Sequence, residues 1–474
     1  MEKLSTGIFG FDDLTHGGLP KYSTIILAGS PGSGKTTLAF ETAFNLARDG
    51  KKSLIISTVS EPLAKMVRFM SSFSFFDRKL IGKEIFFEDI SELIQKEDPD
   101  AILKHIDSLI KKIRPELLII DSFKSLCENL FDSEKIKIRR KFVYTLSLRL
   151  SVWQVTSFFI GEYLLSDVRK EIEFSVADGI VYLFGTEEAE LQKRYIQILK
   201  LRGSSFEKGK QYFDITSDGI KIYLRLRPDI ERIRYSFSEK EIKTGISEID
   251  KMLGGGIRKG SVTLISGPTG TGKTMFTLKF AESYLRADNN HKFLFFSFEE
   301  SPAWLIQYSQ GMKFELDTFI KDNRLKFIFL SPVELDLDYL CFRIMHEIKN
   351  TGNDIGVAMD SITSFRYSQR DDIRYREMLW SLMNFFRYSN NTAFITYEVE
   401  DPFGSNLIAP DMKLSVLSDN IISLRYYEDP PYIRKAISVI KMRGKKHSKE
   451  VKEFDIVQGK GIIVKELVSE CIMK

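Results

Sequence analysis

Two segments of the chain have the residue types and the spacing of a phosphate-binding loop. Residues 29–36 read GSPGSGKT and residues 267–274 read GPTGTGKT, and both match GxxxxGK(S/T). In this pattern the glycines let backbone N–H groups converge on phosphates, the lysine reaches the terminal phosphates and the hydroxyl can ligate Mg²⁺. Each segment follows a strand-like apolar run and opens a helical pattern, which is the context that the motif requires. The sequence therefore predicts two sites for ATP and Mg²⁺.

Every residue of the two loops is a candidate nucleotide contact. These residues are Gly29, Ser30, Pro31, Gly32, Ser33, Gly34, Lys35 and Thr36 in the first loop, and Gly267, Pro268, Thr269, Gly270, Thr271, Gly272, Lys273 and Thr274 in the second. The metal ligands predicted in the loops are Thr36 and Thr274. Two later apolar runs, LLIIDS and GVAMDS, place Asp121 and Asp360 at strand ends, where a carboxylate can hold the magnesium shell.

Hydrolysis of ATP also needs a base that orients the attacking water, and the two copies differ in this respect. In the second copy the run FLFFSF is followed by Glu299 and Glu300, which places two carboxylates at the carboxyl edge of the expected sheet. In the first copy Val59 and Ser60 occupy the corresponding positions. Glu61 comes one position late, and a one-residue slip aims a strand side chain at the opposite face unless a bulge corrects it. The sequence therefore predicts catalytic glutamates in the second copy.

The same features recur in one order along nearly the whole chain. TGIFGFDDLTHGGLP at 6–20 matches TGISEIDKMLGGGIR at 244–258, with an offset of 238 residues that also separates the two P-loop lysines. KLRG at 200–203 meets KMRG at 441–444, with an offset of 241 residues. Several matches in one order, with a drift of only a few residues, indicate two copies of one fold.

Within each copy, apolar runs of strand length alternate with helical patterns. Near-continuous apolar strands predict a mostly parallel sheet that helices cover on both faces. The later runs, such as IVYLFGT and IISLRYY, are typical of a more antiparallel extension. The predicted fold class is α/β, with one P-loop domain over residues 1–236 and another over residues 237–474.

The run TGIxxxDxxxGGG(I/L) before a P-loop resembles the RecA-like ATPases, which include RadA and KaiC. Tandem duplication, the paired glutamates of SFEESP and K-x-R-G late in each copy resemble KaiC in particular, over roughly residues 5 to 455. The resemblance implies two tandem RecA-like domains in a homo-hexameric, double-tiered ring with nucleotide between protomers. It also implies that four cations reach the phosphates of the neighbouring subunit's nucleotide: Lys200, Arg202, Lys441 and Arg443.

Two departures from KaiC bear on function. KaiC phosphorylates an adjacent serine and threonine in its second domain, and the matching stretch LSVLSDNIISL has Ser415 followed by Val416. Ser415 is therefore a candidate phosphosite, without the two-site cycle of a clock protein. The chain also ends 30 residues after Gly444, which is shorter than the tail that the clock protein uses to engage its activator. We expect a KaiC-like ATPase with a signalling protein partner.

Composition narrows the remaining classes. Hydrophobic residues make up 43% and charged residues 28% of 474 residues, with a net charge of +4, which describes a globular chain without a strong bias toward anionic partners. Three scattered cysteines and five dispersed histidines support neither a disulfide framework nor a zinc site. No run approaches the roughly 18 apolar residues of a membrane helix. We expect a cytoplasmic protein with no membrane partner.

The main expectation is ATP hydrolysis in the second domain, with the first domain binding ATP to hold the ring together. The alternative is a RadA- or DnaB-like DNA-dependent motor, supported by the basic segment EKIKIRRKF at 134–142. We do not expect a nucleic-acid partner, because this segment lacks interleaved aromatic residues, but the alternative stays open. A third class is a nucleotide-dependent signalling scaffold whose output is partner binding and whose slow hydrolysis serves as a timer. The sequence does not separate it from the first class, because the rate depends on how water is placed within the site.

Overall fold

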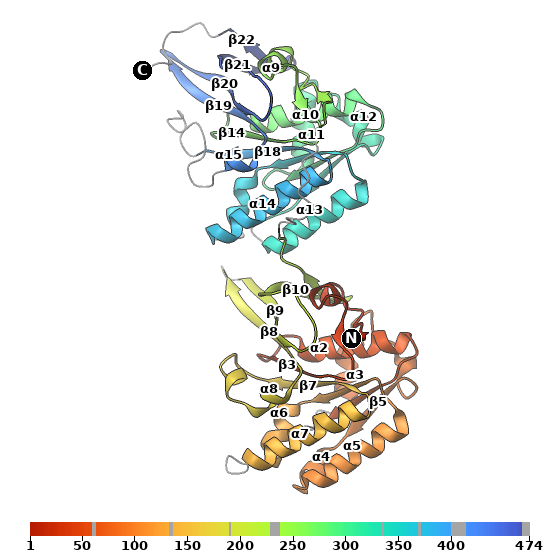
Figure 1. Ribbon diagram of the computed structural model, residues 1–474. Coiled ribbons are helices and arrows are strands. Elements are labelled where there is room, and N and C mark those ends of the chain that lie inside the picture. The colour runs from red at the N-terminus through yellow and green to blue at the C-terminus, as the bar shows by residue number, and fades with distance from the viewer. Residues whose placement is uncertain are drawn as a thin grey trace. The chain divides into compact units, whose positions relative to one another are not determined.

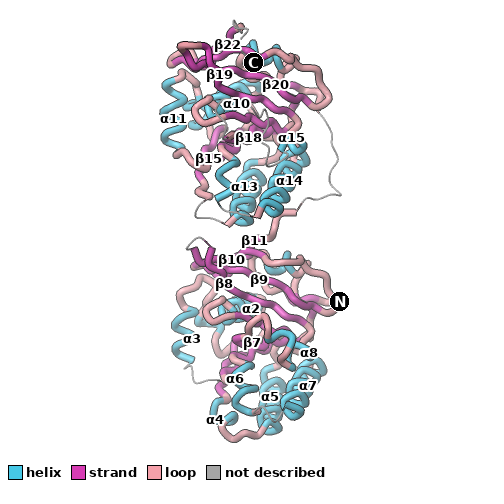
Figure 2. Tube along the Cα trace, turned by 90° about the vertical axis from the view of Figure 1, so that its left-hand side faces the viewer, coloured by secondary structure: helices cyan, strands magenta, loops and turns pink. Residues whose placement is uncertain are grey.

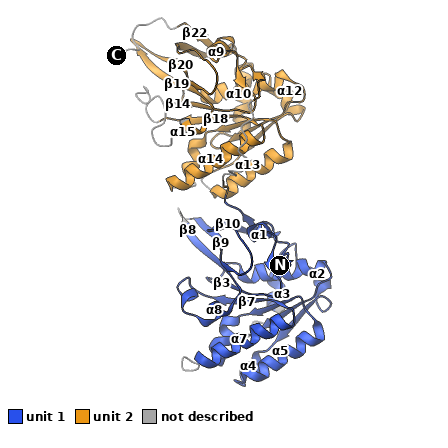
Figure 3. Ribbon diagram, in the orientation of Figure 1, with its two compact units in different colours: residues 1–225 blue, residues 226–474 orange. Residues whose placement is uncertain are grey.

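The structure is a computed structural model that describes residues 1–58, 63–131, 136–188, 191–227, 238–332, 336–367, 371–399 and 414–466. The chain divides into two compact units, residues 1–225 and residues 226–474 (Figure 3). The boundary predicted between residues 236 and 237 lies outside the described residues and stays a prediction. In the described ranges, no helix combines the length and the apolar character needed to cross a membrane.

The first unit is built on a nine-stranded sheet with the order β11-β10-β9-β8-β3-β7-β6-β4-β5. The six strands from β5 to β8 are parallel, and β9, β10 and β11 continue the sheet in antiparallel fashion. The strands are β3 (Thr24–Gly29), β4 (Ser53–Ser57), β5 (Ile85–Asp89), β6 (Leu117–Asp121), β7 (Thr156–Glu162), β8 (Gly179–Glu188), β9 (Leu191–Leu201), β10 (Gln211–Thr216) and β11 (Gly219–Tyr223); β1 (Lys3–Leu4) pairs separately with β2 (Leu19–Pro20).

Helices cover both faces of this sheet because its central strands are apolar on both faces. Ile25 and Leu27 of β3 pack on one face with Phe40 of α2, and Ile26 packs on the other face with Leu146 of α7. Helices α5 and α7 lie side by side on that second face (Figure 1). The helices are α1 (Phe11–Leu14), α2 (Lys35–Arg48), α3 (Leu63–Met70), α4 (Ser91–Ile94), α5 (Pro99–Ile113), α6 (Phe123–Leu130), α7 (Ile136–Val152) and α8 (Ile172–Val176), with 3-10 turns η1 (Arg78–Leu80) and η3 (Asp167–Arg169).

The second unit repeats this architecture with the order β16-β15-β17-β18-β14-β19-β20-β21-β22. The six strands from β16 to β19 are parallel and the last three are antiparallel. The strands are β14 (Val262–Gly267), β15 (Phe293–Ser297), β16 (Leu325–Phe329), β17 (Gly356–Asp360), β18 (Thr392–Glu398), β19 (Asn420–Asp429), β20 (Tyr432–Met442), β21 (Val451–Val457) and β22 (Gly461–Lys465); β12 (Glu241–Ile242) pairs with β13 (Ile257–Arg258).

The helices of the second unit occupy equivalent positions, with α13 and α14 along one face of the sheet (Figure 2). They are α9 (Ser247–Met252), α10 (Lys273–Ala287), α11 (Pro302–Gly311), α12 (Leu316–Lys321), α13 (Leu337–Thr351), α14 (Asp372–Tyr388) and α15 (Leu414–Leu417), with the 3-10 turn η4 (Ile362–Tyr367). The predicted α/β class, the duplication and the antiparallel extension are confirmed.

Candidate active sites

The first site is formed around the P-loop at residues 29–36. Strand β3 ends at Gly29 and helix α2 begins at Lys35, as the motif predicts. The Lys35 side chain folds back onto its own loop, and Nζ donates hydrogen bonds to Gly29 O at 3.1 Å and to Ser30 O at 2.7 Å. Burial lowers the pKa of Lys35, while Glu162 and Asp121 oppose this shift. A buried ammonium held by two carbonyl groups and the Ser33 hydroxyl can turn to a phosphate by exchanging neutral partners.

The predicted metal ligands of the first site are in contact. Thr36 Oγ1 donates a hydrogen bond to Asp121 Oδ2 at 2.8 Å, because β6 and β3 lie on either side of β7 and both end at the same edge of the sheet. A cavity of about 490 Å³ opens over the loop. Its lining residues are Gly32, Ser33, Gly34, Lys35, Thr36, Thr37, Asp121, Ser122, Lys124, Ser125, Glu128, Ile160, Gly161, Glu162 and Ile215.

The second site repeats this geometry around the P-loop at residues 267–274. Lys273 Nζ donates hydrogen bonds to Gly267 O and Pro268 O, both at 2.9 Å, and burial lowers the pKa of Lys273. Asp360 accepts hydrogen bonds from Thr396 and Thr274. Burial raises the pKa of Asp360, against the effect of these hydrogen bonds and of Lys273. A cavity of about 460 Å³ opens over this loop as well.

The predicted catalytic glutamates line the cavity of the second site. Ser364 Oγ donates a hydrogen bond to Glu299 Oε1, which fixes the position of that carboxylate. In the described part of the chain, Glu300 Oε2 is buried and has no hydrogen-bond partner. Burial, together with the charges of Asp360 and Glu299, raises the pKa of Glu300 to about 7. This carboxyl can therefore accept a proton near neutral pH.

The corresponding positions of the first site, Val59 and Ser60, lie outside the described residues, as does Glu61. The described residues before that gap end at Thr58, which accepts a hydrogen bond from Ser122 N at 2.9 Å. The predicted difference in carboxylates between the two sites therefore stays a prediction from the sequence.

Sequence reasoning missed two acidic residues that the fold brings into the sites. Glu162 ends β7 and Glu398 ends β18, and each lines the cavity of its unit. Glu398 accepts a hydrogen bond from Thr269 of the P-loop. The signal was present, because the matching strands TSFFIGE and TAFITYE both end in Glu. Their proximity to the P-loops follows from strand order, since β7 and β18 lie directly beside the P-loop strands.

The second site also has neighbouring residues that no motif indicated. Trp304 and Tyr308 of α11 line the cavity with ring centroids 4.6 Å apart. Lys435 of β20 donates a hydrogen bond to Gly270 O at 2.9 Å, and Tyr426 of β19 donates one to Thr269 O at 3.2 Å. The antiparallel extension thus supports the tip of the P-loop.

The K-x-R-G cations lie at the opposite edge of each sheet from the P-loop of the same unit. Arg202 follows β9, whose last residue pairs with Gly179 at the start of β8, whereas the P-loop follows the end of the parallel strand β3. Lys200 Nζ donates to Phe174 O at 3.2 Å, and Lys441 Nζ donates to Ser418 O at 2.7 Å. The guanidinium of Arg202 lies 3.5 Å from Asp178, and that of Arg443 lies 3.6 Å from Asp419. These cations are not brought to their own nucleotide sites.

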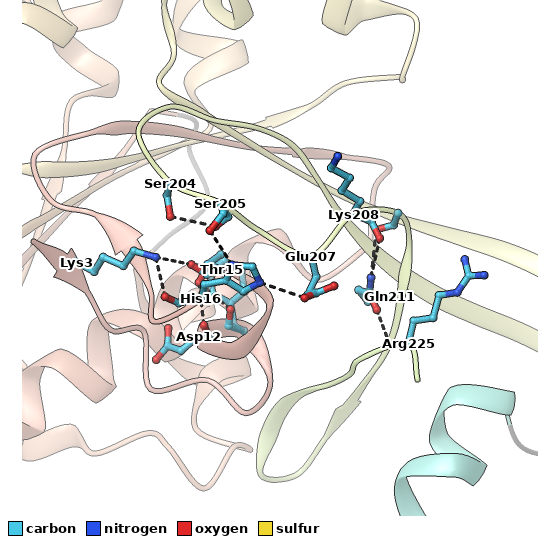
Figure 4. A network of polar contacts seen from close by, with 12 residues as sticks. Lys3, Asp12, Thr15, His16, Ser204, Ser205, Glu207, Lys208, Gln211 and Arg225 are labelled. Atoms are coloured by element: carbon cyan, nitrogen blue, oxygen red, sulfur yellow. Dashed lines mark hydrogen bonds and ion pairs between the residues drawn. The ribbon is translucent and has the colours of Figure 1, made fainter. Parts of the chain in front are cut away.

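The motif that precedes the first P-loop holds the segment that follows KLRG (Figure 4). Asp12 Oδ1 accepts hydrogen bonds from Thr6 N at 3.0 Å and from Thr6 Oγ1 at 2.9 Å, which closes the amino-terminal turn. His16 then reaches across, with Nδ1 2.8 Å from Ser205 Oγ and Nε2 3.1 Å from Glu207 Oε1. The motif therefore positions the loop after Arg202.

Ser415, the candidate phosphosite, belongs to α15. Its side chain lies outside the described part of the structure, so its role stays a prediction.

Residues 4–227 match the KaiC ATPase family, and residues 242–469 match the same family a second time. The chain belongs to the KaiC ATPase family. The circadian clock oscillator protein KaiC of Picosynechococcus sp. is 29% identical over 476 residues, which cover 98% of this chain and 90% of the relative. The KaiC of Synechococcus elongatus is 30% identical over 98% of this chain and 89% of the relative. The resemblance inferred from the motifs is confirmed, and both KaiC-type units carry the complete P-loop of an ATPase.

Proposed function

We propose that this chain hydrolyses ATP to ADP and phosphate mainly at the second site, while the first site binds ATP to hold a ring of subunits together. The observation that carries the proposal is the carboxylate pair at the second site. Glu299 is held by Ser364, and the pKa of the neighbouring Glu300 is raised to about 7. At the first site the sequence has Val59 and Ser60 in the corresponding register.

Mg²⁺ fits both sites, because the hydroxyl and carboxylate groups that meet there present oxygen atoms, which are the ligands that Mg²⁺ prefers. At the first site Thr36 and Asp121 would hold the ion, and at the second site Thr274 and Asp360 would do so. When bound, Mg²⁺ neutralises charge that develops on the phosphate oxygens during transfer.

The residues of the second site would then divide the work. Lys273 exchanges its loop carbonyls for phosphate oxygens, and the loop N–H groups bind the remaining charge. Glu300 accepts a proton from the attacking water, for which a pKa near 7 is suited. Glu299 orients that water from a position that Ser364 holds.

A homo-hexameric ring accounts for the placement of the K-x-R-G cations. Lys200 and Arg202 lie near the start of strand β3, whereas the P-loop of their own unit follows its end. They are therefore too far along the strand to contact a phosphate bound at that P-loop. In a ring, this edge can face the nucleotide of a neighbouring subunit, and Lys441 and Arg443 are placed likewise in the second unit.

Exposed apolar side chains on α7 and α14 favour a partner on these helices: Tyr144, Leu148, Val152, Ile373, Trp380 and Tyr388.

Transfer of phosphate to Ser415 and a signalling partner that reads it are subsidiary proposals. They rest on the position of Ser415 in a chain of the KaiC family. Incubation with radiolabelled ATP should label the parent chain and leave a Ser415→Ala variant unlabelled. Equal labelling of the two proteins would remove Ser415 as the acceptor.

Steady-state ATP hydrolysis by a Glu299→Gln, Glu300→Gln double variant tests the main proposal. We expect turnover to fall by about 100-fold or more, since a positioned base contributes this much. A Glu61→Gln variant is the matched control in the first unit and should retain turnover. Turnover that survives in the double variant would mean that the first site hydrolyses ATP.

The same assay with single-stranded DNA examines the motor alternative. We expect single-stranded DNA not to stimulate ATP turnover, because Arg139 of the basic segment is already bound to the buried Glu173. DNA-stimulated turnover that declines steeply with salt would favour the motor instead.

A further inference from the structure

The cavity of the first site contains a second ammonium group besides that of the P-loop. Lys124, in the first turn of α6, lines this cavity together with Lys35. Its Nζ donates a hydrogen bond to Glu162 O at 2.7 Å and lies 5.2 Å from the centre of the Tyr163 ring. Glu162 is the register partner of Gly29, the first residue of the P-loop. Lys124 therefore lies at the edge of the sheet where the phosphates of ATP are expected.

The second unit has a threonine at the equivalent position. Asp121 and Asp360 are equivalent strand ends, so Lys124 corresponds to Thr363. Thr363 Oγ1 accepts a hydrogen bond from Glu398 N at 2.9 Å, and the next residue, Ser364, holds Glu299. The same edge of the fold thus supports the carboxylate pair in the second unit and presents a cation in the first.

The lining of the first cavity is also less acidic than that of the second. The first cavity is lined by two lysines and three acidic residues: Lys35, Lys124, Asp121, Glu128 and Glu162. The second is lined by two lysines and four acidic residues: Lys273, Lys435, Asp360, Glu299, Glu300 and Glu398. The second lysine of that cavity, Lys435, is bound to the tip of the P-loop rather than placed beside the strand-end glutamate.

The present hydrogen bond of Lys124 is to a neutral carbonyl, and the ammonium forms a long, exposed ion pair with Glu128 Oε1 at 3.7 Å. Exchange of the carbonyl for a phosphate oxygen would give a charge-assisted hydrogen bond, which is about twice as strong as a neutral one. The contact of the Lys124 ammonium with the face of the Tyr163 ring is a cation–π contact, which is weak at a partly exposed site. The ammonium can therefore turn to a phosphate at the cost of one neutral hydrogen bond and weak contacts.

We propose that Lys124 is a binding residue for the terminal phosphate of ATP at the first site and makes this site one that retains ATP. The inference rests on the proposed binding of ATP there. An added cation that holds the phosphate in the ground state lowers the dissociation rate, but it does not raise turnover without a base that activates water. The first site would thus hold ATP longer than the second.

Release of a fluorescent ATP analogue, chased with unlabelled ATP, tests this role. The parent is full-length Lys273→Ala, in which the second P-loop has lost its phosphate-binding lysine, so that the signal comes from the first site. Lys124→Met keeps the apolar stem and removes the charge, and we expect release to become about tenfold faster or more. Lys124→Arg keeps the charge and should release the analogue nearly as slowly as the parent. Lys112→Met, on the exposed side of α5, is the matched control.

A release rate in Lys124→Met equal to that of the parent would overturn the proposal, provided that both proteins bind the analogue. A purely structural role would instead lower the thermal midpoint of nucleotide-free Lys124→Met and leave the release rate unchanged. This outcome is distinct from failure of the proposed function, because release at the first site is measured without reference to which site hydrolyses ATP. A parent that binds no analogue would contradict the proposed ATP site itself.

Discussion

The glycine before each P-loop lysine determines how closely the loop packs on the antiparallel extension. Gly272 has a φ of 103°, in the left-handed region that other residues avoid. A Cβ atom at this position would lie 2.2 Å from Cδ1 of Ile456 in β21. Gly34 repeats the arrangement in the first unit, with a φ of 98° and 2.9 Å from such a Cβ to Ile215 Cδ1. The glycine before the lysine is therefore required by its backbone conformation and by the close packing of the loop on the antiparallel strands.

We expect Gly272→Ala to weaken ATP binding at the second site at least tenfold and to destabilise the second unit by about 1–3 kcal/mol, because alanine is strained at this φ. Nucleotide titration and urea denaturation measure the two effects. Gly311→Ala is the control, since Gly311 ends α11 with no left-handed φ and its Cβ would meet no atom within 4 Å. Equal behaviour of the two variants would contradict the geometric account.

Helix α2 is joined to the antiparallel extension by one buried carboxyl group. Glu41 accepts a hydrogen bond from Ile220 N of β11 at 2.8 Å and is only 5% exposed. Burial raises the pKa of Glu41 from 4.5 to about 7, against the opposing effects of that hydrogen bond, Arg48 and Lys221. The helix that begins at the P-loop is therefore linked to the sheet through a group that titrates near neutral pH.

The sign of the resulting pH dependence follows from the direction of this shift. The native state binds the Glu41 proton more tightly than the unfolded chain does, so the contribution of this group to stability is fully present below about pH 4.5 and is lost as the pH rises through about 7. The loss is at most about 3 kcal/mol. We expect Glu41→Gln to remove this part of the decrease in urea midpoint between pH 5 and pH 8. The exposed Glu92→Gln should keep it, and an unchanged pH dependence in Glu41→Gln would contradict the assignment.

The elements also show why the sites were only partly predictable from sequence. The P-loops and the strands that end in Asp121 and Asp360 are contiguous patterns, so their positions followed from spacing alone. Glu398 and Glu162 come from other segments of the chain, and they meet the loops only because β18 lies beside β14 and β7 lies beside β3. No local pattern specifies this strand order. The aromatic pair of α11 follows the predicted glutamates directly in the sequence, but no motif assigns aromatic residues there to the site.

At the scale of the whole molecule, the proposed ring would make each working site depend on two subunits. Arg443 lies at the edge of its sheet opposite the P-loop of its own unit, next to Asp419. The proposed carboxylate pair, Glu299 and Glu300, lies at the P-loop edge. In a ring, each second site would combine the carboxylates of one subunit with the arginine of its neighbour. Two different defects would then be able to complement each other.

We therefore expect Arg443→Ala alone and the Glu299→Gln, Glu300→Gln variant alone to have little ATPase activity, whereas rings assembled from an equal mixture recover part of it. With random assembly, about one quarter of the sites would have an intact carboxylate pair facing an intact arginine. Mixtures are refolded or re-assembled together and compared with the unmixed variants at equal total concentration. A mixture no more active than its components would mean that Arg443 acts within its own subunit, or only on the fold, and the shared site would be wrong. Arg258→Ala, which removes a hydrogen bond to Gly444 O, is the control for a general loss of structure in this loop.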